Sequence, residues 1–219
     1  MILNIFKPIW LFHQMDKEGL IKSLEEKKFP KHVIEAFSRV KRQDFAPYNL
    51  RSMAYEDSPL PIGHGQTISQ PYTIALMLSL LDLKQGQKVL EIGSGSGYVL
   101  ALISEIVGKK GRVFGVELIN ELAKKSKDNL HDYKNTRVLH RNGSTGLPEE
   151  APFDRILISA ALHDIPEVIM GQLKNTGILV APKGSRFEQE IIAIQRKSKT
   201  EFEMKKRLPG FIFVPFIGE

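Results

Sequence analysis

The stretch Val89-Leu90-Glu91-Ile92-Gly93-Ser94-Gly95-Ser96-Gly97-Tyr98 decides the fold of this chain. Residues 88–92 form a short apolar run typical of a buried strand, and residues 98–107 have the apolar spacing of a helix. Between them, glycines at alternate positions let a ligand approach the backbone without side-chain obstruction. In a doubly wound sheet such a loop lies at the carboxyl ends of the strands, where ligands bind. We therefore expect an α/β fold with a nucleotide-like ligand over this loop.

Beyond residue 87 the chain alternates predicted strands with predicted helices. We expect further strands at residues 113–116, 137–140, 155–159 and 178–181, and helices at residues 120–130, with Asn120 as a cap, and 166–173. This order implies a parallel sheet covered on both faces. Residues 189–195, 201–206 and 211–217 have strand patterns without intervening helices and should add an antiparallel C-terminal edge. The predicted fold is α/β and doubly wound, with a mostly parallel seven-stranded sheet.

The first part of the chain is predicted to be mainly helical. We expect helices at residues 16–28, 31–41 and 71–81, with an ordered loop over residues 44–69. The predicted division is an N-terminal extension at 1–14, a helical cap with a substrate loop at 15–82, and a Rossmann-like core at 83–219, in one compact domain. Residues 1–12 are too short to span a bilayer and lack signal-peptide features. We expect this stretch to pack on the body of its own or of a neighbouring subunit, and the chain to be cytoplasmic.

The composition excludes several kinds of chemistry. The 219 residues include no cysteine, so disulfides, zinc–thiolate sites and cysteine nucleophiles are excluded. The net charge of +6 would suit an anionic partner, but the basic residues occur in scattered clusters typical of solvated surfaces. We therefore expect that the protein binds neither nucleic acid nor a membrane. We also expect it to be a monomer. The six histidines show no metal-ligand spacing, so we predict no metal site.

Two acidic residues narrow the identity of the ligand. Glu117 ends the second predicted strand, about 20 residues after Gly97, which is the separation expected for an acid that binds a ribose. Glu91 lies two residues before Gly93, where a carboxylate would repel a pyrophosphate but suit an ammonium group. S-adenosylmethionine carries an ammonium and a sulfonium group and no phosphate. It is therefore favoured over a dinucleotide.

Asn142 and Gly143 end the third predicted strand, where the adenine edge of such a ligand would lie. The Asn142 amide could accept a hydrogen bond from the adenine amino group and donate one to a ring nitrogen. An ordinary turn is an equally good interpretation, because Asn-Gly is a strong turn pair.

The acceptor side of the site is predicted to be the segment from Pro59 to Tyr72, with the sequence Pro-Leu-Pro-Ile-Gly-His-Gly-Gln-Thr-Ile-Ser-Gln-Pro-Tyr. It offers hydroxyls, amides and backbone N–H groups about two dozen residues before the glycine loop. It contains no strong base and no thiol, so the reaction that it serves should need neither.

These residues resemble the protein-L-isoaspartate (D-aspartate) O-methyltransferase family over roughly residues 39–217. The matching stretches are Ala54-Tyr55 through Asp57, Pro59–Tyr72, Val89–Tyr98, Gly143–Gly146, Ala151-Pro152-Phe153-Asp154, Ile165-Pro166, Gln172-Leu173-Lys174 and Phe213-Val214-Pro215. The resemblance implies the fold of class I S-adenosylmethionine-dependent methyltransferases. It also implies methyl transfer to the free carboxylate of isoaspartyl residues in damaged proteins, with D-aspartyl residues as a further candidate acceptor and S-adenosylhomocysteine as the product. A carboxylate with a pKa near ~4 is ionised at pH 7 and needs no general base.

The resemblance also implies roles for individual residues. Ser69 is the expected active-site hydroxyl, Thr67 a neighbour that contacts the substrate, and Val214 a source of backbone contacts to the substrate. Ser69 could instead cap the helix that follows, a common role for serine. The expected cofactor-binding residues are Glu91, Gly93, Ser94, Gly95, Gly97, Glu117, Asn142 and Gly143.

Neighbouring polar and aromatic residues are expected to be structural. We expect Asp57 to hold its loop by hydrogen bonds, His64 to be a variable loop residue, and Tyr98 and Phe45 to pack rather than stack on substrate.

Two departures from the family pattern leave alternatives open. Arg141-Asn142-Gly143 stands where the family usually has Gly-Asp-Gly, and Ile212 replaces a frequent arginine. The alternatives are a methyltransferase acting on another acceptor, such as RNA or a small molecule, and a cofactor-binding module that has lost catalysis. The fourth strand is followed by small residues rather than by the Asn/Asp-Pro-Pro-aromatic tetrad favoured for methylation of adenine or cytosine amino groups.

Overall fold

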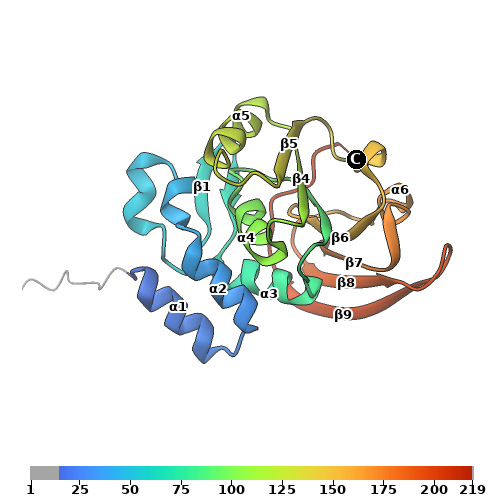
Figure 1. The fold of residues 1–219 in the computed structure, drawn as a ribbon, viewed down its shortest axis with the longest axis horizontal. Helices are drawn as coiled ribbons and strands as arrows, with labels where there is room; N and C mark the ends of the chain where they lie inside the picture. Colours follow the sequence, from blue (N-terminus) through green and yellow to red (C-terminus); the bar gives the residue numbers. More distant parts are fainter. Residues whose placement is uncertain (1–14, 219) are drawn as a thin grey trace, which may run out of the picture.

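The computed structural model describes residues 15–218 (Figure 1). The predicted N-terminal extension, residues 1–14, lies outside the described residues, so the expectation that it packs on the protein is not addressed. Nine strands are described within residues 15–218. Their bounds are β1 Leu60–Gly63, β2 Gln66–Ile68, β3 Lys88–Ile92, β4 Arg112–Glu117, β5 Thr136–His140, β6 Phe153–Ile158, β7 Leu173–Gly184, β8 Gln189–Arg196 and β9 Phe202–Phe211.

The main sheet has seven strands in the order β5-β4-β3-β6-β7-β8-β9 (Figure 1). Strands β5, β4, β3, β6 and β7 are parallel to one another, whereas β8 and β9 add antiparallel pairing at one edge. The chain order reverses at β3, from which β4 and β5 extend to one side and β6 and β7 to the other. The predicted doubly wound, mostly parallel sheet with an antiparallel C-terminal edge is confirmed.

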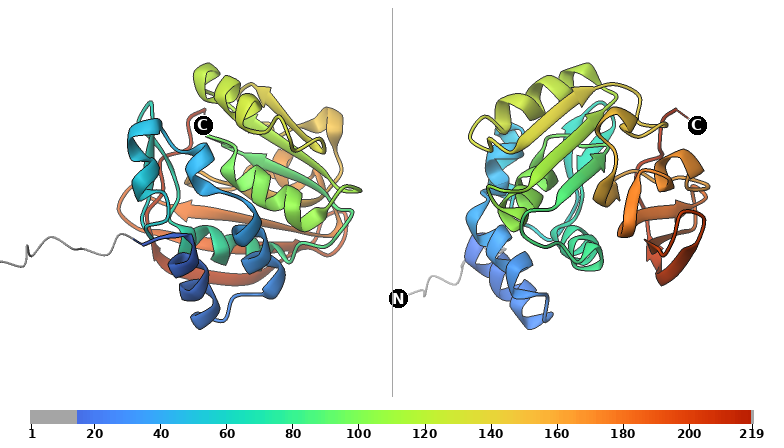
Figure 2. Two further views of the ribbon diagram at one scale, coloured as in Figure 1. Left: turned by 60° about the vertical axis from the view of Figure 1, so that its left-hand side comes forward. Right: turned by 45° about the vertical axis from the view of Figure 1, so that its right-hand side comes forward.

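The helices described are α1 Lys17–Glu26, α2 Lys31–Arg39, α3 Pro71–Leu81, α4 Tyr98–Val107, α5 Asn120–Asn129 and α6 Glu167–Met170, with 3-10 turns at Arg42–Phe45, Tyr48–Met53 and Pro148–Glu150. Helices α3, α4 and α5 pack against the sheet, and α2 packs on α3 and α4 (Figure 2). Part of the predicted 166–173 helix is wrong: α6 is a single short turn, and the chain enters β7 already at Leu173.

Two apolar clusters cover the two faces of the sheet. Because successive side chains in a strand point to opposite faces, Val89 joins the cluster under the helices while Leu90 and Ile92 join the cluster on the other side. By the same alternation Glu91 lies on the helical face. In β4, Phe114 and Val116 face the second cluster, so Glu117 also lies on the helical face. The pleat thus brings both acids to one side of the sheet, at its carboxyl edge.

The expected loop at residues 44–69 is wrong in its second half. It contains the 3-10 turns and an antiparallel hairpin of β1 and β2, joined by a turn in which Gly63, His64 and Gly65 all have positive φ. Leu60, Ile62 and Ile68 point inward from this hairpin. Two prolines and two glycines in a stretch of seven residues obscured this alternating pattern in the sequence.

Two smaller expectations are also corrected. Residues 211–217 are not a strand: β9 ends at Phe211, and Pro215 beyond it makes one isolated bridge to Ala161. Asn120 does not cap α5, because Ile119 occupies the N-cap position and Asn120 is the first helical residue. The division into residues 15–82 and 83–219 stays a prediction. One apolar cluster contains residues from both of these parts. Among the described residues, no helix is long and apolar enough to cross a membrane.

Gly97 offers a test of how α4 packs on α5. Its φ is +87°, and a Cβ there would lie 2.6 Å from the Ser126 hydroxyl and 2.9 Å from Leu130. Gly97→Ala should therefore lower the free energy of unfolding by about 2–5 kcal/mol, the sum of left-handed strain and overpacking. Gly65→Ala is the matched control, since Gly65 has a φ of +70° and open space around its Cα. It should lose only the strain of about 1–2 kcal/mol. Urea unfolding measures both, and equal losses would contradict close packing at Gly97.

Candidate functional site

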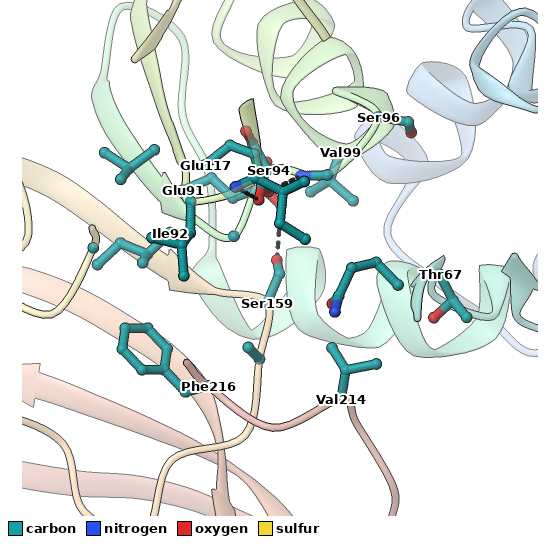
Figure 3. A pocket seen from close by; sticks show the side chains of 18 of the residues that line it. Thr67, Glu91, Ile92, Ser94, Ser96, Val99, Glu117, Ser159, Val214 and Phe216 are labelled. Atoms are coloured by element: carbon teal, nitrogen blue, oxygen red, sulfur yellow. Dashed lines mark hydrogen bonds between the residues drawn. The ribbon is translucent and has the colours of Figure 1, made fainter. Parts of the chain in front are cut away.

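A cavity lies at the carboxyl edge of the sheet, between the glycine loop, the β1–β2 hairpin and the C-terminal segment (Figure 3). It is lined by residues 66–69, 91–96, 98–99, 116–119, 143, 159–160 and 214–217. The structure thus brings the predicted donor side and the predicted acceptor side to one hollow. Of the predicted site residues, only Gly97 and Asn142 do not line it.

Glu91 is a fully buried acid with one free oxygen. The Ser159 hydroxyl donates to its Oε1 at 2.7 Å (Figure 3), whereas Oε2 has no hydrogen-bond partner among the described residues. Burial raises the pKa of Glu91 to about 8, although the Ser159 bond opposes the shift and the nearby charge of Glu117 adds to it. A buried carboxylate oxygen without a partner is unfavourable. A cationic ligand group in the cavity would compensate it, so the donor set fits an ammonium group.

Glu117 is held rigidly by the backbone. Its Oε2 accepts from the Gly95 N–H at 2.8 Å, and its Oε1 accepts from the Ile119 N–H at 2.9 Å. A carboxylate has about four lone-pair sites, so both oxygens keep the capacity to accept a further hydrogen bond. The side chain is only 6% exposed and lies against the glycine loop. This geometry suits a pair of ribose hydroxyls, which remains a predicted role.

The glycine loop turns around the end of β4. The N–H groups of Gly93 and Ser94 both donate to the Val116 carbonyl, and Gly93 and Gly95 have positive φ values of +84° and +52°. The Ser94 hydroxyl is buried without a partner among the described residues. Gly97 instead serves as the N-cap of α4 and packs against α5. The first two glycines therefore face the cavity, and the third faces the helices.

On the acceptor side, Ser69 and Thr67 line the cavity, and Figure 3 places Thr67 across from Val214. The interpretation of Ser69 as a helix cap is wrong, because the N-cap of α3 is Gln70, with no side-chain cap bond. Asp57 provides a side-chain acceptor at this helix end instead. Its carboxylate accepts from the Tyr72 N–H at 2.8 Å, which confirms its expected structural role. The Ser69 hydroxyl is thereby left for another partner.

Arg42, which the sequence analysis missed, ties the acceptor segment together. Its guanidinium is fully buried and donates to the carbonyls of Ala54 at 2.6 Å and Ser58 at 3.1 Å, and more weakly to Glu56 at 3.3 Å. It also donates to the carbonyl of Ser69 at 3.1 Å. The position of Ser69 therefore depends on a charge buried behind it.

The opposite wall is held by another buried polar side chain. Gln189 accepts from the Phe213 N–H at 2.6 Å, and its amide donates to the Phe213 carbonyl at 3.4 Å. The next carbonyl, that of Val214, accepts from the Ala161 N–H at 2.9 Å. Within residues 15–218 the Val214 N–H has no acceptor, so it is the main-chain group that Val214 can still offer to a substrate.

Several expected residues lie elsewhere or serve packing. Asn142 is exposed outside the cavity lining, and its side-chain oxygen accepts from the Ser144 N–H at 2.8 Å, which supports the turn interpretation, while Gly143 lines the cavity. His64 lies exposed at the hairpin tip. Tyr98 and Phe45 pack on each other with ring centroids 5.5 Å apart, as expected. Within residues 15–218 no group of three His, Asp or Glu side chains could hold a metal ion.

Comparison with protein families gives one match over nearly the whole chain. The family model described as "Protein-L-isoaspartate(D-aspartate) O-methyltransferase (PCMT)" matches residues 14–219. A protein-L-isoaspartate O-methyltransferase of Methanothrix thermoacetophila is 46% identical over 207 residues, which cover 94% of this chain and 96% of the relative. One of Methanopyrus kandleri is 46% identical over 190 residues, which cover 85% of this chain and 84% of the relative.

Two solved structures are similar in fold and sequence. A protein-L-isoaspartate O-methyltransferase superposes with a TM-score of 0.83 at 29% identity, covering 93% of this chain and 66% of that chain. A Plasmodium falciparum protein described as a putative protein-L-isoaspartate O-methyltransferase, in complex with S-adenosyl-L-homocysteine, gives a TM-score of 0.79 at 26% identity. That match covers 92% of this chain and 98% of the other.

Glu91 predicts a pH-dependent affinity for a ligand with an ammonium group. Because burial raises the pKa of Glu91 to about 8, the acid is mostly protonated below that pH and must release its proton when a cation binds. The affinity for S-adenosylhomocysteine should therefore rise with pH below 8, by up to about tenfold per unit. Calorimetry in buffers of different ionisation enthalpy should detect the released proton. Glu91→Gln should remove the pH dependence, and a wild-type affinity independent of pH would contradict this role.

Arg42→Lys should separate turnover from donor binding. Lysine keeps the charge but cannot reach four carbonyls, so Ser69 should shift. A displacement of about 1 Å can cost roughly 100-fold, so kcat of the predicted methyl transfer should fall about 10–100-fold. Calorimetry should find the affinity for S-adenosylhomocysteine retained. Ser69→Ala should likewise lower kcat, but with little change in Tm.

Arg155→Lys is the matched control for Arg42→Lys. Arg155 is also buried and donates to three backbone carbonyls, those of Leu81, Asp82 and Asp154, but it lies near the start of β6, away from the cavity. Its loss should lower Tm comparably while sparing kcat. If both variants lost kcat in parallel with Tm, Arg42 would act through overall stability alone.

Proposed function

The chain belongs to the protein-L-isoaspartate(D-aspartate) O-methyltransferase family, and we propose that it transfers a methyl group from S-adenosylmethionine to the free carboxylate of L-isoaspartyl residues in damaged proteins. The observation that carries this proposal is the joining of two half-sites in one cavity. Glu91, Glu117 and the glycine loop form the donor side. Ser69 and Val214 lie on the acceptor side.

The donor side would hold the cofactor by its charge and its hydroxyls. Glu91 would bind the ammonium group and Glu117 the ribose hydroxyls, and the adenine would lie against Gly143 and the apolar Leu118 and Ile119; all five residues line the cavity. When bound, S-adenosylmethionine supplies a methyl group made electrophilic by the sulfonium sulfur. The glycine loop contributes close backbone approach, because no Cβ of Gly93 or Gly95 projects toward the ligand.

The acceptor side would align a carboxylate rather than activate it. An isoaspartyl carboxylate with a pKa near ~4 is already ionised at pH 7, so no general base is required. The Ser69 hydroxyl and the Val214 N–H are donors that can hold the carboxylate and the substrate main chain. Alignment and removal of water from the nucleophile then supply the rate. The methyl ester would close to a succinimide, which hydrolyses partly to normal aspartate.

Three further expectations stay predictions. The first is a monomeric state, the second is the lack of a nucleic-acid partner, and the third is a cytoplasmic location. The structure adds one relevant observation: many basic residues outside the cavity are paired, including Arg207 with Glu190 and Lys174 with Asp154. Such pairs leave less positive charge for binding nucleic acid.

Two peptides that differ only in an aspartyl or an isoaspartyl linkage test the proposed function. With radiolabelled S-adenosylmethionine, base-labile label should enter the isoaspartyl peptide alone, because only that linkage places a free α-carboxylate at the reacting position. A D-aspartyl peptide tests the wider specificity in the family name. Donor binding without label in any peptide would favour a cofactor-binding module. Label in RNA or a small molecule, but not in peptide, would favour another acceptor.

A further inference from the structure

Asn142-Gly143 is the single Asn-Gly pair in the sequence. It follows the end of β5, and its two residues face different surroundings. Asn142 is exposed to solvent, whereas Gly143 is buried and lines the donor cavity. The pair therefore joins the surface of the molecule to the wall of its site.

An asparagine followed by glycine can convert into isoaspartate by a simple intramolecular reaction. The backbone nitrogen of the glycine attacks the side-chain amide carbon, the new N–C bond closes a succinimide, and the amide nitrogen leaves as ammonia. Water then opens either carbonyl of the ring and gives aspartate or isoaspartate. Glycine favours the reaction because it has no Cβ near the attacking nitrogen and its backbone is permissive.

The local geometry leaves the attacking nitrogen of Gly143 available, while the Asn142 amide lies beside Gly218, where an added Cβ would come within 2.7 Å of it. The Asn142 side-chain oxygen accepts from the Ser144 N–H at 2.8 Å, and a donor at a carbonyl oxygen stabilises the charge that develops there during attack. Within residues 15–218 the Gly143 N–H donates to no acceptor, so no hydrogen bond must break to free it.

The other described asparagines lack this combination. Asn135 uses both ends of its amide, with the Ser104 hydroxyl at 2.6 Å and the Gly108 carbonyl at 3.0 Å. Asn129 donates to the Ser96 carbonyl at 2.9 Å. Asn49 and Asn175 are as exposed as Asn142, but a leucine and a threonine follow them, and the half-buried Asn120 is followed by a glutamate. Asn142 is therefore the site where accessibility and an unhindered neighbour coincide.

An isoaspartate at this position would alter the cavity wall. It adds one methylene to the main chain just before Gly143, where space is absent: a Cβ on Gly143 would lie 2.4 Å from Ile92. It also leaves a free α-carboxylate at residue 142, which is the chemical group that the proposed function methylates.

We propose that Asn142-Gly143 is a site at which this chain deamidates to isoaspartate and so becomes a substrate of its own proposed activity. We also propose that the damaged molecule binds S-adenosylmethionine more weakly. The part that concerns methylation rests on the proposed function. The deamidation itself rests only on the exposed Asn142, the Gly143 N–H that has no acceptor within residues 15–218, and the hydrogen bond from the Ser144 N–H to the Asn142 side chain.

The first test follows the mass of each asparagine during incubation of the full chain at mildly alkaline pH. A glutamate-specific protease should release residues 122–149 as one fragment, because no glutamate lies between Glu121 and Glu149. That fragment also contains Asn129 and Asn135 as internal comparators, and Asn49 and Asn175 serve as exposed comparators. Asn142 should convert several times faster than all four, and Asn142→Gln should abolish the conversion at this position. Conversion no faster than at Asn175 would overturn the proposal.

The second test supplies the aged 122–149 fragment to fresh full-length enzyme with radiolabelled S-adenosylmethionine. An unrelated synthetic isoaspartyl peptide is the reference. Label at residue 142 of the fragment supports the proposal. Label in the reference but not in the fragment overturns it. Absence of label in both would instead refute the proposed function, while the mass measurement still decides the deamidation.

The third test concerns the cavity. Deamidation adds a negative charge, so ion exchange separates aged from intact chains. The aged fraction contains aspartate as well as isoaspartate at residue 142, so the reference is the Asn142→Asp variant. The aged fraction should bind S-adenosylhomocysteine several-fold more weakly than this variant by calorimetry. An unchanged affinity would show that the cavity wall tolerates the lengthened backbone and would overturn this part of the proposal.

Discussion

The acceptor side of the cavity depends on the hydrogen bonds that the buried guanidinium of Arg42 donates to backbone carbonyls. A charge removed from water must be compensated by hydrogen bonds, and Arg42 obtains them from backbone carbonyls on two separate stretches, residues 54–58 and Ser69. Its planar fork can bind several oxygens at once, which an ammonium group cannot do in the same way. The hydrogen bonds that compensate the Arg42 charge therefore also fix the position of Ser69. Gln189 plays the comparable part for Phe213, the residue before Val214.

The donor side depends instead on the pleat of the sheet. Alternation puts Glu91 and Glu117 on the helical face of neighbouring strands, and their parallel pairing brings both to the same edge. The two acids nevertheless have different environments. Glu117 is satisfied by two backbone N–H groups, whereas Glu91 keeps one buried oxygen without a partner among the described residues. One site thus contains a carboxyl group held by two backbone N–H groups and a second acid with a buried oxygen left for a ligand.

The predictable parts of this molecule are those with local signals. The glycine loop, the acid at the end of β4 and the strand–helix alternation lie in short windows, so the sheet and most donor residues could be predicted. No such signal marked Ser159, Arg42 and Gln189, because each is an isolated polar residue with distant partners. The nearest partner in the sequence is 12 positions from Arg42, 24 from Gln189 and 68 from Ser159. The hairpin and the segment after Phe211 were misassigned because prolines and glycines interrupt their patterns.

The hydrogen bonds donated by Arg42 affect which residues of the acceptor segment can change during evolution. Every acceptor that Arg42 uses is a main-chain oxygen, which any amino acid provides at that position. Apart from Asp57, whose carboxylate accepts from the Tyr72 N–H, and Glu56, whose carboxylate accepts from the Met15 N–H, the side chains of the acceptor segment are therefore not needed for the bonds to Arg42. A lineage could exchange residues such as Ser58 or Thr67 and acquire new acceptors while keeping the same framework.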